Sequence, residues 1–206
     1  MCGLKLGRQT VLNLGAKATG QLIRMAKDNG IPTIIDDKLN DIDHTNTQIS
    51  TAYFKMGFDG IIVNPFAGWK GGLAPVFHLA HTLGRGVITL VYMSHPEADR
   101  NYGQLVLSQG KTPRPQYMIF AQESVSWRAD GAVVGATKPA IIKEVKSVLG
   151  RKVPIYSPGI GTQGGRLKEA SRAGTDYFII GRRITKAADP GKTAARFAEQ
   201  SINTKA

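Results

Sequence analysis

Short apolar segments recur along the chain at nearly regular intervals. They begin near residues 4, 32, 58, 86, 131, 153 and 176, so that five of the six intervals span 22 to 28 residues and the fourth spans 45. Segments of this kind, bounded by glycine or proline, are typical of buried strands. Stretches with helical periodicity lie between them, for example at 18–26, 49–56 and 141–149. Because parallel strands need a crossover that returns to the same edge of the sheet, the alternation predicts an α/β fold with a parallel sheet.

The number and length of these units favour a (β/α)8 TIM barrel over an open sheet. Such barrels usually need ~250 residues and eight strands, whereas this chain has 206 residues and seven recognisable strands. The sequence therefore predicts a single TIM-barrel domain over residues 1–206 that lacks the first strand–helix unit. We expect the longest interval to hold an additional loop from Glu97 to about Pro115.

Composition excludes several classes of protein. No stretch approaches the ~18 consecutive apolar residues of a membrane-spanning helix, and no export signal is visible at the N-terminus. Cys2 is the only cysteine, which excludes a disulfide framework or a multi-cysteine metal site and is typical of a reducing compartment. We therefore expect a cytoplasmic protein with no membrane partner.

The chain is strongly basic. It carries 27 Lys and Arg residues against 15 Asp and Glu, a formal net charge of +12. A positive field of this size attracts small anionic substrates or polyanions. The basic residues are scattered and do not alternate with the stacking aromatics that single-strand binders need. A small anionic substrate is the predicted partner, in preference to nucleic acid.

Charged residues follow two of the predicted strands at the end where such barrels carry their active sites. Lys5 ends the first strand, and Asp36 and Lys38 end the second. Because strand side chains alternate, Asp36 and Lys38 are expected on one side, with Asp37 facing the helices or its own loop and Asp41 beyond the strand. An ammonium beside carboxylates stays protonated, so it can donate a proton and stabilise an anion.

A solvated turn that caps the next helix is the alternative for Asp36-Asp37-Lys38. In that interpretation Asp43 or Thr45 is the N-cap residue. The apolar residues before Asp36, together with Lys5 at the end of the neighbouring strand, favour the functional interpretation.

A glycine-rich loop lies after the strand near residue 153, with the sequence Ser-Pro-Gly-Ile-Gly-Thr-Gln-Gly-Gly over 157–165. The last strand ends in Ile-Ile-Gly-Arg over 179–182. Glycines let backbone N–H groups approach an anion, and barrels often bind phosphate with the loops after their last two strands. Arg182 adds a planar fork for phosphate oxygens. The alternative is a flexible loop beside a surface arginine. It does not explain why the glycines and the arginine follow two neighbouring strands.

Together these segments resemble orotidine 5′-phosphate decarboxylases of the archaeal kind. The resemblance covers nearly the whole chain and rests on Asp36-x-Lys38-x-x-Asp41-Ile42-x-x-Thr45, Met93-Ser94-His95-Pro96, Val133-Val134-Gly135-Ala136-Thr137, Ser157-Pro158-Gly159-Ile160-Gly161 with Gln163-Gly164-Gly165, and Ile180-Gly181-Arg182. The Asp-x-Lys-x-x-Asp spacing is shared with related sugar-phosphate enzymes. The Ser-His-Pro and Ser-Pro-Gly motifs make the resemblance specific.

The resemblance implies decarboxylation of orotidine 5′-phosphate to uridine 5′-phosphate without a cofactor or a metal. Lys38 would stabilise the carbanion at C6 and then protonate it, and Asp36 would lie near the departing carboxylate. Lys5 would hold the charged network and contact the ribose. Asp41 completes the set of catalytic residues that the resemblance implies.

The resemblance also implies a substrate-binding set and a homodimer. Ser94 would read the pyrimidine, and Gln163 with Arg182 and the loop amides would close over the phosphate. Asp41, Ile42 and Thr45 would reach into the site of the partner subunit, so that two sites are shared. The full binding set that the resemblance implies is Ile42, Thr45, Ser94, Pro158, Gly159, Gly161, Gln163, Gly164, Gly181 and Arg182.

Two departures from the family pattern stand out. The family has a further strand before the one bearing Lys5, ending in an aspartate that binds ribose, and we expect that this chain starts late. Asp37 occupies a position that is usually apolar, and Asp43-His44 replaces a common Pro-x pair. His44 and His95 are expected to orient other groups or to face solvent.

Two other functions remain open at this point. A related sugar-phosphate lyase, such as a hexulose-phosphate synthase or a ketogulonate-phosphate decarboxylase, would use the same acidic and basic signature with magnesium. A non-catalytic barrel that binds nucleotides or RNA would suit the net charge and the missing strand. Chelation would silence the first alternative, and RNA binding by the second would fall steeply with salt.

Overall fold

Strands and helices alternate in the computed structural model, which describes residues 1–107, 112–161 and 163–204. Among these residues the main sheet has seven strands, and the registers of its strand pairs are parallel. Chain contacts divide the fold into two compact units, Met1–Leu90 and Val91–Ala206. No helix within the described ranges is both long and apolar enough to cross a membrane.

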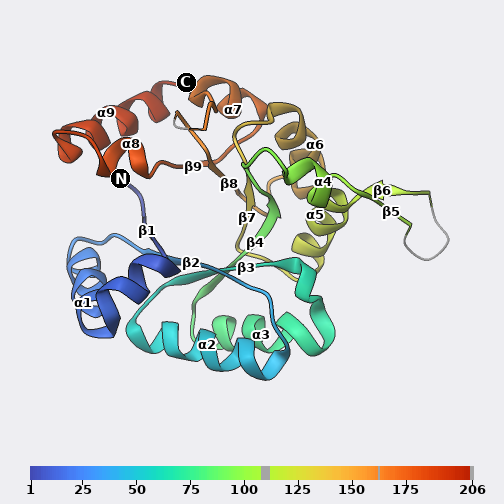
Figure 1. The fold of residues 1–206 in the computed structure, drawn as a ribbon, viewed down its shortest axis with the longest axis horizontal. Helices are drawn as coiled ribbons and strands as arrows, with labels where there is room; N and C mark the ends of the chain where they lie inside the picture. The colour runs from blue at the N-terminus through green and yellow to red at the C-terminus, as the bar shows by residue number, and fades with distance from the viewer. Residues whose placement is uncertain (108–111, 162, 205–206) are drawn as a thin grey trace. The chain divides into compact units, whose positions relative to one another are not determined.

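The first unit contains parallel strands in the order β1-β2-β3-β4, with helices between them in the chain (Figure 1). Its elements are β1 Leu4–Gly7, α1 Arg8–Asp28, β2 Thr33–Leu39, α2 Asp43–Met56, β3 Gly60–Val63, η1 Pro65–Ala67, η2 Trp69–Leu73, α3 Ala74–Thr82 and β4 Gly86–Tyr92, which continues into the second unit. Helices α2 and α3 lie side by side (Figure 1). The core of this unit includes Ile35, Phe58, Ile61 and Phe77, all at most 1% exposed.

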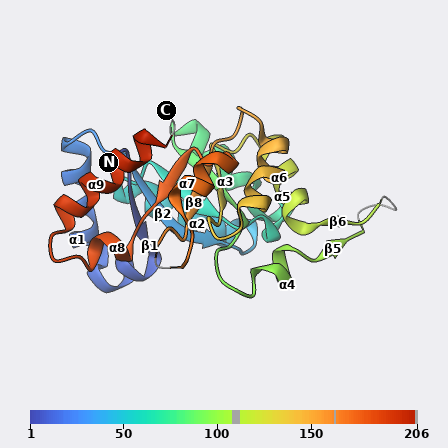
Figure 2. The ribbon, with the colours of Figure 1, turned by 90° about the horizontal axis from the view of Figure 1, so that it is seen from above.

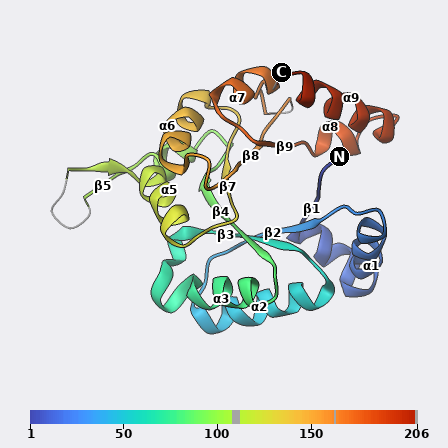
Figure 3. The same ribbon diagram turned by 180° about the vertical axis from the view of Figure 1, so that it is seen from behind.

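The second unit contains the parallel strands β7, β8 and β9 in that order. Its elements are α4 Ala98–Tyr102, β5 Leu105–Val106, β6 Arg114–Pro115, α5 Gln116–Ser126, β7 Gly131–Val134, α6 Pro139–Leu149, β8 Ile155–Pro158, α7 Leu167–Ala173, β9 Tyr177–Ile179, α8 Arg182–Thr185 and α9 Pro190–Asn203. Helix α6 lies between α5 and α7 (Figure 3). The expected loop after Glu97 holds α4 and an antiparallel pair, β5 and β6, which projects beside α5 (Figure 2). Positions 108–111 of that loop lie outside the described residues.

The predicted α/β fold of the TIM-barrel class is confirmed. Each of the seven apolar segments overlaps a strand of the main sheet, and the stretches with helical periodicity fall in α1, α2 and α6. Gly57 ends α2 with a φ of 106°, the left-handed conformation that a helix cap requires. The seven strands found in the described ranges are one fewer than a complete barrel has. A single domain over residues 1–206 stays a prediction.

The alternative in which Asp43 or Thr45 caps a helix is wrong. Helix α2 begins at Asp43, and its N-cap residue is Ile42, whose side chain has no acceptor. Asp43 Oδ1 instead accepts a hydrogen bond from the backbone N–H of its neighbour His44 at 2.6 Å. The charged residues of β2 are therefore not explained by helix capping.

Candidate active site

Strand β2 is bulged where its charged residues lie. Between the pairs Ile35–Ile61 and Leu39–Val63, β2 advances four residues while β3 advances two. Lys38 lies in this bulge with a φ of 59°, a left-handed conformation that residues other than glycine rarely adopt. Bulges re-aim side chains, and backbone strain of this kind clusters at functional sites. The direction of the Lys38 side chain therefore depends on the bulge and not on the regular alternation of side chains along a strand.

Lys5, Asp36 and Lys38 form a compact group, the acid–base cluster. Asp36 accepts a hydrogen bond from Lys5 Nζ through Oδ2 at 2.7 Å and one from Lys38 Nζ through Oδ1 at 2.5 Å. The side chains are 24%, 17% and 37% exposed in the order Lys5, Asp36, Lys38, so they are shielded but reachable by a ligand. With two ammonium groups on one carboxylate, the cluster has a formal charge of +1.

The electrostatics of the cluster keep Asp36 ionised. Burial by itself would raise the pKa of Asp36, but the positive charges of Lys5 and Lys38 and their hydrogen bonds outweigh it and lower that pKa below its usual value. At neutral pH the carboxylate therefore holds both ammonium groups in place. A fixed ammonium of this kind can stabilise a negative charge on a bound molecule and can also give it a proton.

Asp37 faces away from the cluster, toward helix α2. Its side chain is 7% exposed, and its Oδ1 accepts a hydrogen bond from the phenol of Tyr53 at 3.0 Å. The expectation that Asp37 points to the helices is confirmed. Tyr53 was not predicted as its partner, because in the sequence it is one of the residues that give α2 its helical periodicity.

Asp41, Ile42 and Thr45 do not join the acid–base cluster within this chain. Asp41 Oδ1 accepts a hydrogen bond from the Ile42 backbone N–H at 2.7 Å, and the Asp41 carboxylate forms no ion pair with any described residue. Ile42 is 63% exposed, and Thr45 is half-buried in the first turn of α2. Asn46, a residue that the sequence analysis missed, is fully buried and donates through Nδ2 to the Asp41 carbonyl at 2.5 Å. The buried amide of Asn46 thus holds the turn at Asp41 and Ile42, while the side chains of these two residues are exposed.

The glycine-rich loop after β8 bonds mainly to itself. Gly161 donates to the Gly165 carbonyl at 2.9 Å, Gly164 to the Gly161 carbonyl at 3.2 Å, and Gly165 to the Gly159 carbonyl at 3.1 Å. Position 162 lies outside the described residues. The N–H groups of these three glycines, which the sequence suggested for an anion, are therefore engaged within the loop.

Two glycines of this loop permit close packing of side chains. Gly159 has a φ of 97°, and a Cβ there would lie 3.1 Å from the Cβ of Ser94, whose hydroxyl donates to Gln163 Oε1 at 3.1 Å. Gly161 has a φ of 76°, and a Cβ there would lie 3.2 Å from the Arg183 side chain. Larger residues would be strained at both positions. Arg183 was missed; its only sequence signal is that it follows the Gly-Arg motif directly.

Gly181 and Arg182 join β9 to α8. A Cβ on Gly181 would meet no atom within 4 Å, so the backbone there is open. Arg182 is exposed and forms no ion pair with any part of the chain that the structure describes. Pro158 ends β8, and its carbonyl accepts a hydrogen bond from Ala136 N–H at 2.8 Å. The Arg182 guanidinium is thus a cation available for an anionic ligand.

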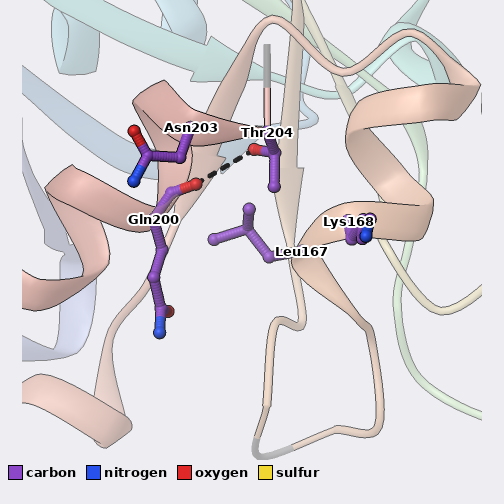
Figure 4. A pocket seen from close by; sticks show the side chains of 5 residues that line it. All are labelled: Leu167, Lys168, Gln200, Asn203 and Thr204. Carbon is purple, nitrogen blue, oxygen red and sulfur yellow. Dashed lines mark hydrogen bonds between the residues drawn. The ribbon is translucent and has the colours of Figure 1, made fainter. Parts of the chain in front are cut away.

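The remaining features to consider are metal binding, the two histidines His44 and His95, and a hollow between two helices. The described residues contain no group of three or more His, Cys, Asp or Glu side chains arranged to hold a metal ion. His44 and His95 are exposed. A hollow of about 300 Å³ lies between α7 and α9 (Figure 4) and is lined by Leu167, Lys168, Gln200, Asn203 and Thr204. None of the residues predicted for the active site lines this hollow.

Comparison of sequences gives a consistent family match. The model of the orotidine 5′-phosphate decarboxylase / HUMPS family matches residues 1–197. An orotidine 5′-phosphate decarboxylase of Methanosarcina mazei is 33% identical over 197 residues, which are 96% of this chain and 82% of that protein. The enzyme of the same name from Pyrococcus abyssi is 36% identical over 174 residues, which are 84% of this chain and 76% of that protein.

Comparison of structures leads to the same family. The orotidine 5′-monophosphate decarboxylase of Sulfolobus solfataricus matches with a TM-score of 0.84 and 26% identity, covering 99% of this chain and 88% of that one. The decarboxylase of Methanocaldococcus jannaschii in complex with the inhibitor BMP matches with a TM-score of 0.83 and 27% identity. That match covers 96% of this chain and 85% of the other.

Proposed function

The chain belongs to the orotidine 5′-phosphate decarboxylase / HUMPS family, and from this premise we propose that it decarboxylates orotidine 5′-phosphate to uridine 5′-phosphate with Lys38 as its central catalytic residue. The family description names two groups, and the relatives above are decarboxylases by name. The observation that carries the proposal is the contact of 2.5 Å between Lys38 Nζ and Asp36 Oδ1. Lys38 is the residue before the last one of β2, and the strand ends are where catalytic groups of such barrels lie, which supports the proposal.

The proposed reaction has two steps and needs only the substrate and the chain. First, the bond between C6 and the carboxylate breaks, carbon dioxide leaves, and the electron pair stays on C6. Second, Lys38 Nζ transfers a proton to C6, which gives uridine 5′-phosphate and a neutral amine. The amine then takes a proton from water. The acid–base cluster supplies the ammonium, and Asp36 holds it in position before the transfer.

Electrostatic stabilisation of the carbanion is the larger part of the proposed catalysis. Repulsion between Asp36 and a substrate carboxylate ~4 Å away would contribute on the order of 4 kcal/mol at an effective dielectric of ~20. That energy is worth about three powers of ten in rate. Both oxygens of Asp36 accept hydrogen bonds from ammonium groups. These positive charges weaken the repulsion between Asp36 and the substrate carboxylate further. The proposal therefore rests on attraction between Lys38 and the developing charge, supported by binding energy from the phosphate.

The proposed binding residues for the nucleotide include Ser94, Gln163 and Arg182. The Ser94–Gln163 hydrogen bond brings the residue assigned to the pyrimidine beside the residue assigned to the phosphate. Arg182 offers its guanidinium to phosphate oxygens. Gly161 and Gly164 contribute through the shape of the loop, because their N–H groups are already engaged. The space beside the Gly181 Cα is open, so we propose that an anion approaches the backbone there.

A direct assay tests the proposed activity. The purified chain should convert orotidine 5′-phosphate to uridine 5′-phosphate and carbon dioxide, at the same rate before and after treatment with a chelator. Both products are quantified by chromatography and gas analysis. Loss of activity on chelation, restored by magnesium, would favour the sugar-phosphate lyase alternative instead. Tight binding of RNA that weakens steeply with salt, without turnover, would favour the non-catalytic alternative.

We further propose a homodimer with shared active sites in the cytoplasm. Asp41 and Ile42 are exposed on a turn held by Asn46 and do not contact the acid–base cluster of their own chain. The Asp41 carboxylate of a second copy would raise the cluster to two carboxylates for two ammonium groups, which neutralises its charge of +1. The single cysteine suits a reducing compartment.

Mixed dimers test the sharing of sites. Dimers of Lys38→Ala alone and of Asp41→Ala alone should each have below about 1% of the wild-type activity, because each lacks a group that the site needs. A purified heterodimer carrying one chain of each should have about half of the wild-type activity, because one of its two sites combines intact residues from both chains. Co-expression with two affinity tags and a decarboxylation assay measure this. An inactive heterodimer would place Lys38 and Asp41 in the same chain's site.

A further inference from the structure

Asp37, which is buried, and Tyr53, which is half-buried, form a contact on the side of β2 opposite the acid–base cluster. Asp37 is the middle residue of the bulge, between Asp36 and Lys38, and its side chain is on the opposite side of the strand. The Asp37 side chain is 7% exposed, and its Oδ1 accepts a hydrogen bond from the Tyr53 hydroxyl at 3.0 Å. A buried carboxylate is costly unless it is hydrogen-bonded. A role for this pair in the reaction would explain why a charge is retained there.

The Tyr53 side chain is itself fixed in place. Its ring meets the ring of Phe58 edge to face, with centroids 5.8 Å apart, and Phe58 is completely buried. Burial raises the pKa of Tyr53, as does the adjacent Asp37, while the positive charge of Arg8 acts in the opposite direction. The phenol therefore stays protonated at neutral pH and donates to Asp37. Helix α2 thus offers a rigid donor to the bulge.

The backbone of Lys38 needs support from both sides. Lys38 has a left-handed conformation, which is strained at a residue other than glycine and persists only where the surroundings enforce it. On the C-terminal side, Leu39 is 3% exposed and its carbonyl accepts a hydrogen bond from Asn64 N–H at 2.8 Å. On the N-terminal side, the corresponding anchor is the side chain of Asp37 on Tyr53. The strained residue is thus bracketed by two fixed neighbours.

We propose that the Tyr53–Asp37 hydrogen bond is a positioning device that holds the β2 bulge and thereby aims the Lys38 ammonium. Neither residue touches the reacting atoms; both act through the backbone of Lys38. The inference rests on the proposed function, because it assigns a purpose to the orientation of Lys38. It predicts that loss of the hydrogen bond impairs the chemical step more than substrate binding.

Three substitutions separate positioning from charge. Tyr53→Phe removes the donor and keeps the ring on Phe58, and Asp37→Leu removes the acceptor. Each should lower kcat by about 10- to 100-fold, as expected for a displacement of a catalytic group by a fraction of an ångström to an ångström, with KM within about threefold of wild type. Asp37→Asn loses the charge but keeps an oxygen that accepts from Tyr53, so it should retain kcat within about threefold. The double variant Tyr53→Phe with Asp37→Leu should be no worse than either single one, because both remove the same bond.

A second phenol–carboxylate pair, in which Tyr117 is buried and Glu144 is exposed, supplies the control. Tyr117 is 7% exposed and donates to Glu144 Oε2 at 2.5 Å, and burial with that hydrogen bond raises its pKa to about 12. Tyr117→Phe should lower the melting temperature as Tyr53→Phe does, yet leave kcat within about twofold, because no strained catalytic residue adjoins it. Comparison of kcat between Tyr53→Phe and Tyr117→Phe therefore separates a loss of positioning from a general loss of stability.

Amide hydrogen exchange gives a readout that does not need activity. Exchange in the peptide spanning residues 34–41 should be faster in Tyr53→Phe and Asp37→Leu than in wild type, and unchanged in Tyr117→Phe and Asp37→Asn. If Tyr53→Phe matches Tyr117→Phe in kcat, or if Asp37→Asn falls as far as Asp37→Leu, the positioning role is wrong. If the wild-type chain does not decarboxylate the substrate, the proposed function fails, and unchanged exchange in residues 34–41 would then overturn the positioning role separately.

Discussion

Replacing Lys38 by alanine should lower kcat for decarboxylation by at least about 10⁴-fold. The substitution removes an electrostatic contact worth roughly 10²- to 10³-fold and a proton donor worth roughly 10²- to 10⁴-fold, and both act on the same carbon. Affinity for uridine 5′-phosphate should change much less, because the phosphate is bound by other residues. Steady-state kinetics together with isothermal titration of the product measure the two effects.

Lys38→Gly and Lys17→Ala are the controls for this substitution. Glycine relieves the left-handed backbone strain at position 38, so Lys38→Gly should be more stable than Lys38→Ala by roughly 1 kcal/mol while being equally inactive. Lys17 is an exposed lysine on α1 in the same unit, and its alanine variant should keep full activity. Activity of Lys38→Ala within tenfold of wild type would contradict the assigned role.

Replacing Asp36 by asparagine should lower kcat by about 10³-fold. Asp36 is the ion partner of both Lys5 and Lys38, so its loss frees two ammonium groups at once. Misplacement of a catalytic group by ~1 Å can cost about 10²-fold, and the mutual repulsion of the two freed charges adds to that. The effect should appear mainly in kcat, measured with saturating substrate.

The same substitution should change the stability of the chain in acid. The folded-state pKa of Asp36 is lowered from the usual value of 3.8, with burial opposing and the two lysines outweighing it. Such a carboxylate contributes stability that is present above pH 3.8 and is lost as the pH falls through its folded-state pKa. The free energy of unfolding of wild type should therefore fall more steeply below about pH 4 than that of Asp36→Asn. Parallel curves in denaturant titrations at pH 2.5 to 6 would show that the ion pairs contribute nothing.

The elements that carry the site were predictable because they depend on local patterns. Apolar runs bounded by turn residues identified the strands. The charged residues Lys5 and Asp36 were expected at neighbouring strand ends; they do form an ion pair, but both lie within their strands, β1 Leu4–Gly7 and β2 Thr33–Leu39. The end of α2 is a local feature of the same kind, since Gly57 adopts its left-handed conformation more easily than a residue with a side chain. Each of these signals lies within a few residues of the element that it predicts.

The features that were not predictable depend on contacts between distant segments. The bulge in β2 is visible only against the register of β3, and a strict period of two cannot reveal that Lys38 has a positive φ. Tyr53 counts as an apolar residue in a helical pattern, although its hydroxyl is what binds Asp37. Arg183 resembles any surface arginine until Gly161 is found against its side chain. Asn46 likewise gave no sign that it would be buried beneath the Asp41 turn.

A crystal structure of the chain with uridine 5′-phosphate tests most directly whether one substrate molecule is served by Lys38 and by the phosphate-binding residues. Lys38 Nζ should lie within about 3.5 Å of C6, and the Arg182 guanidinium should donate to the phosphate of the same nucleotide at about 2.8 Å. A nucleotide bound at Arg182 with C6 remote from Lys38, or bound in another part of the molecule, would contradict the account.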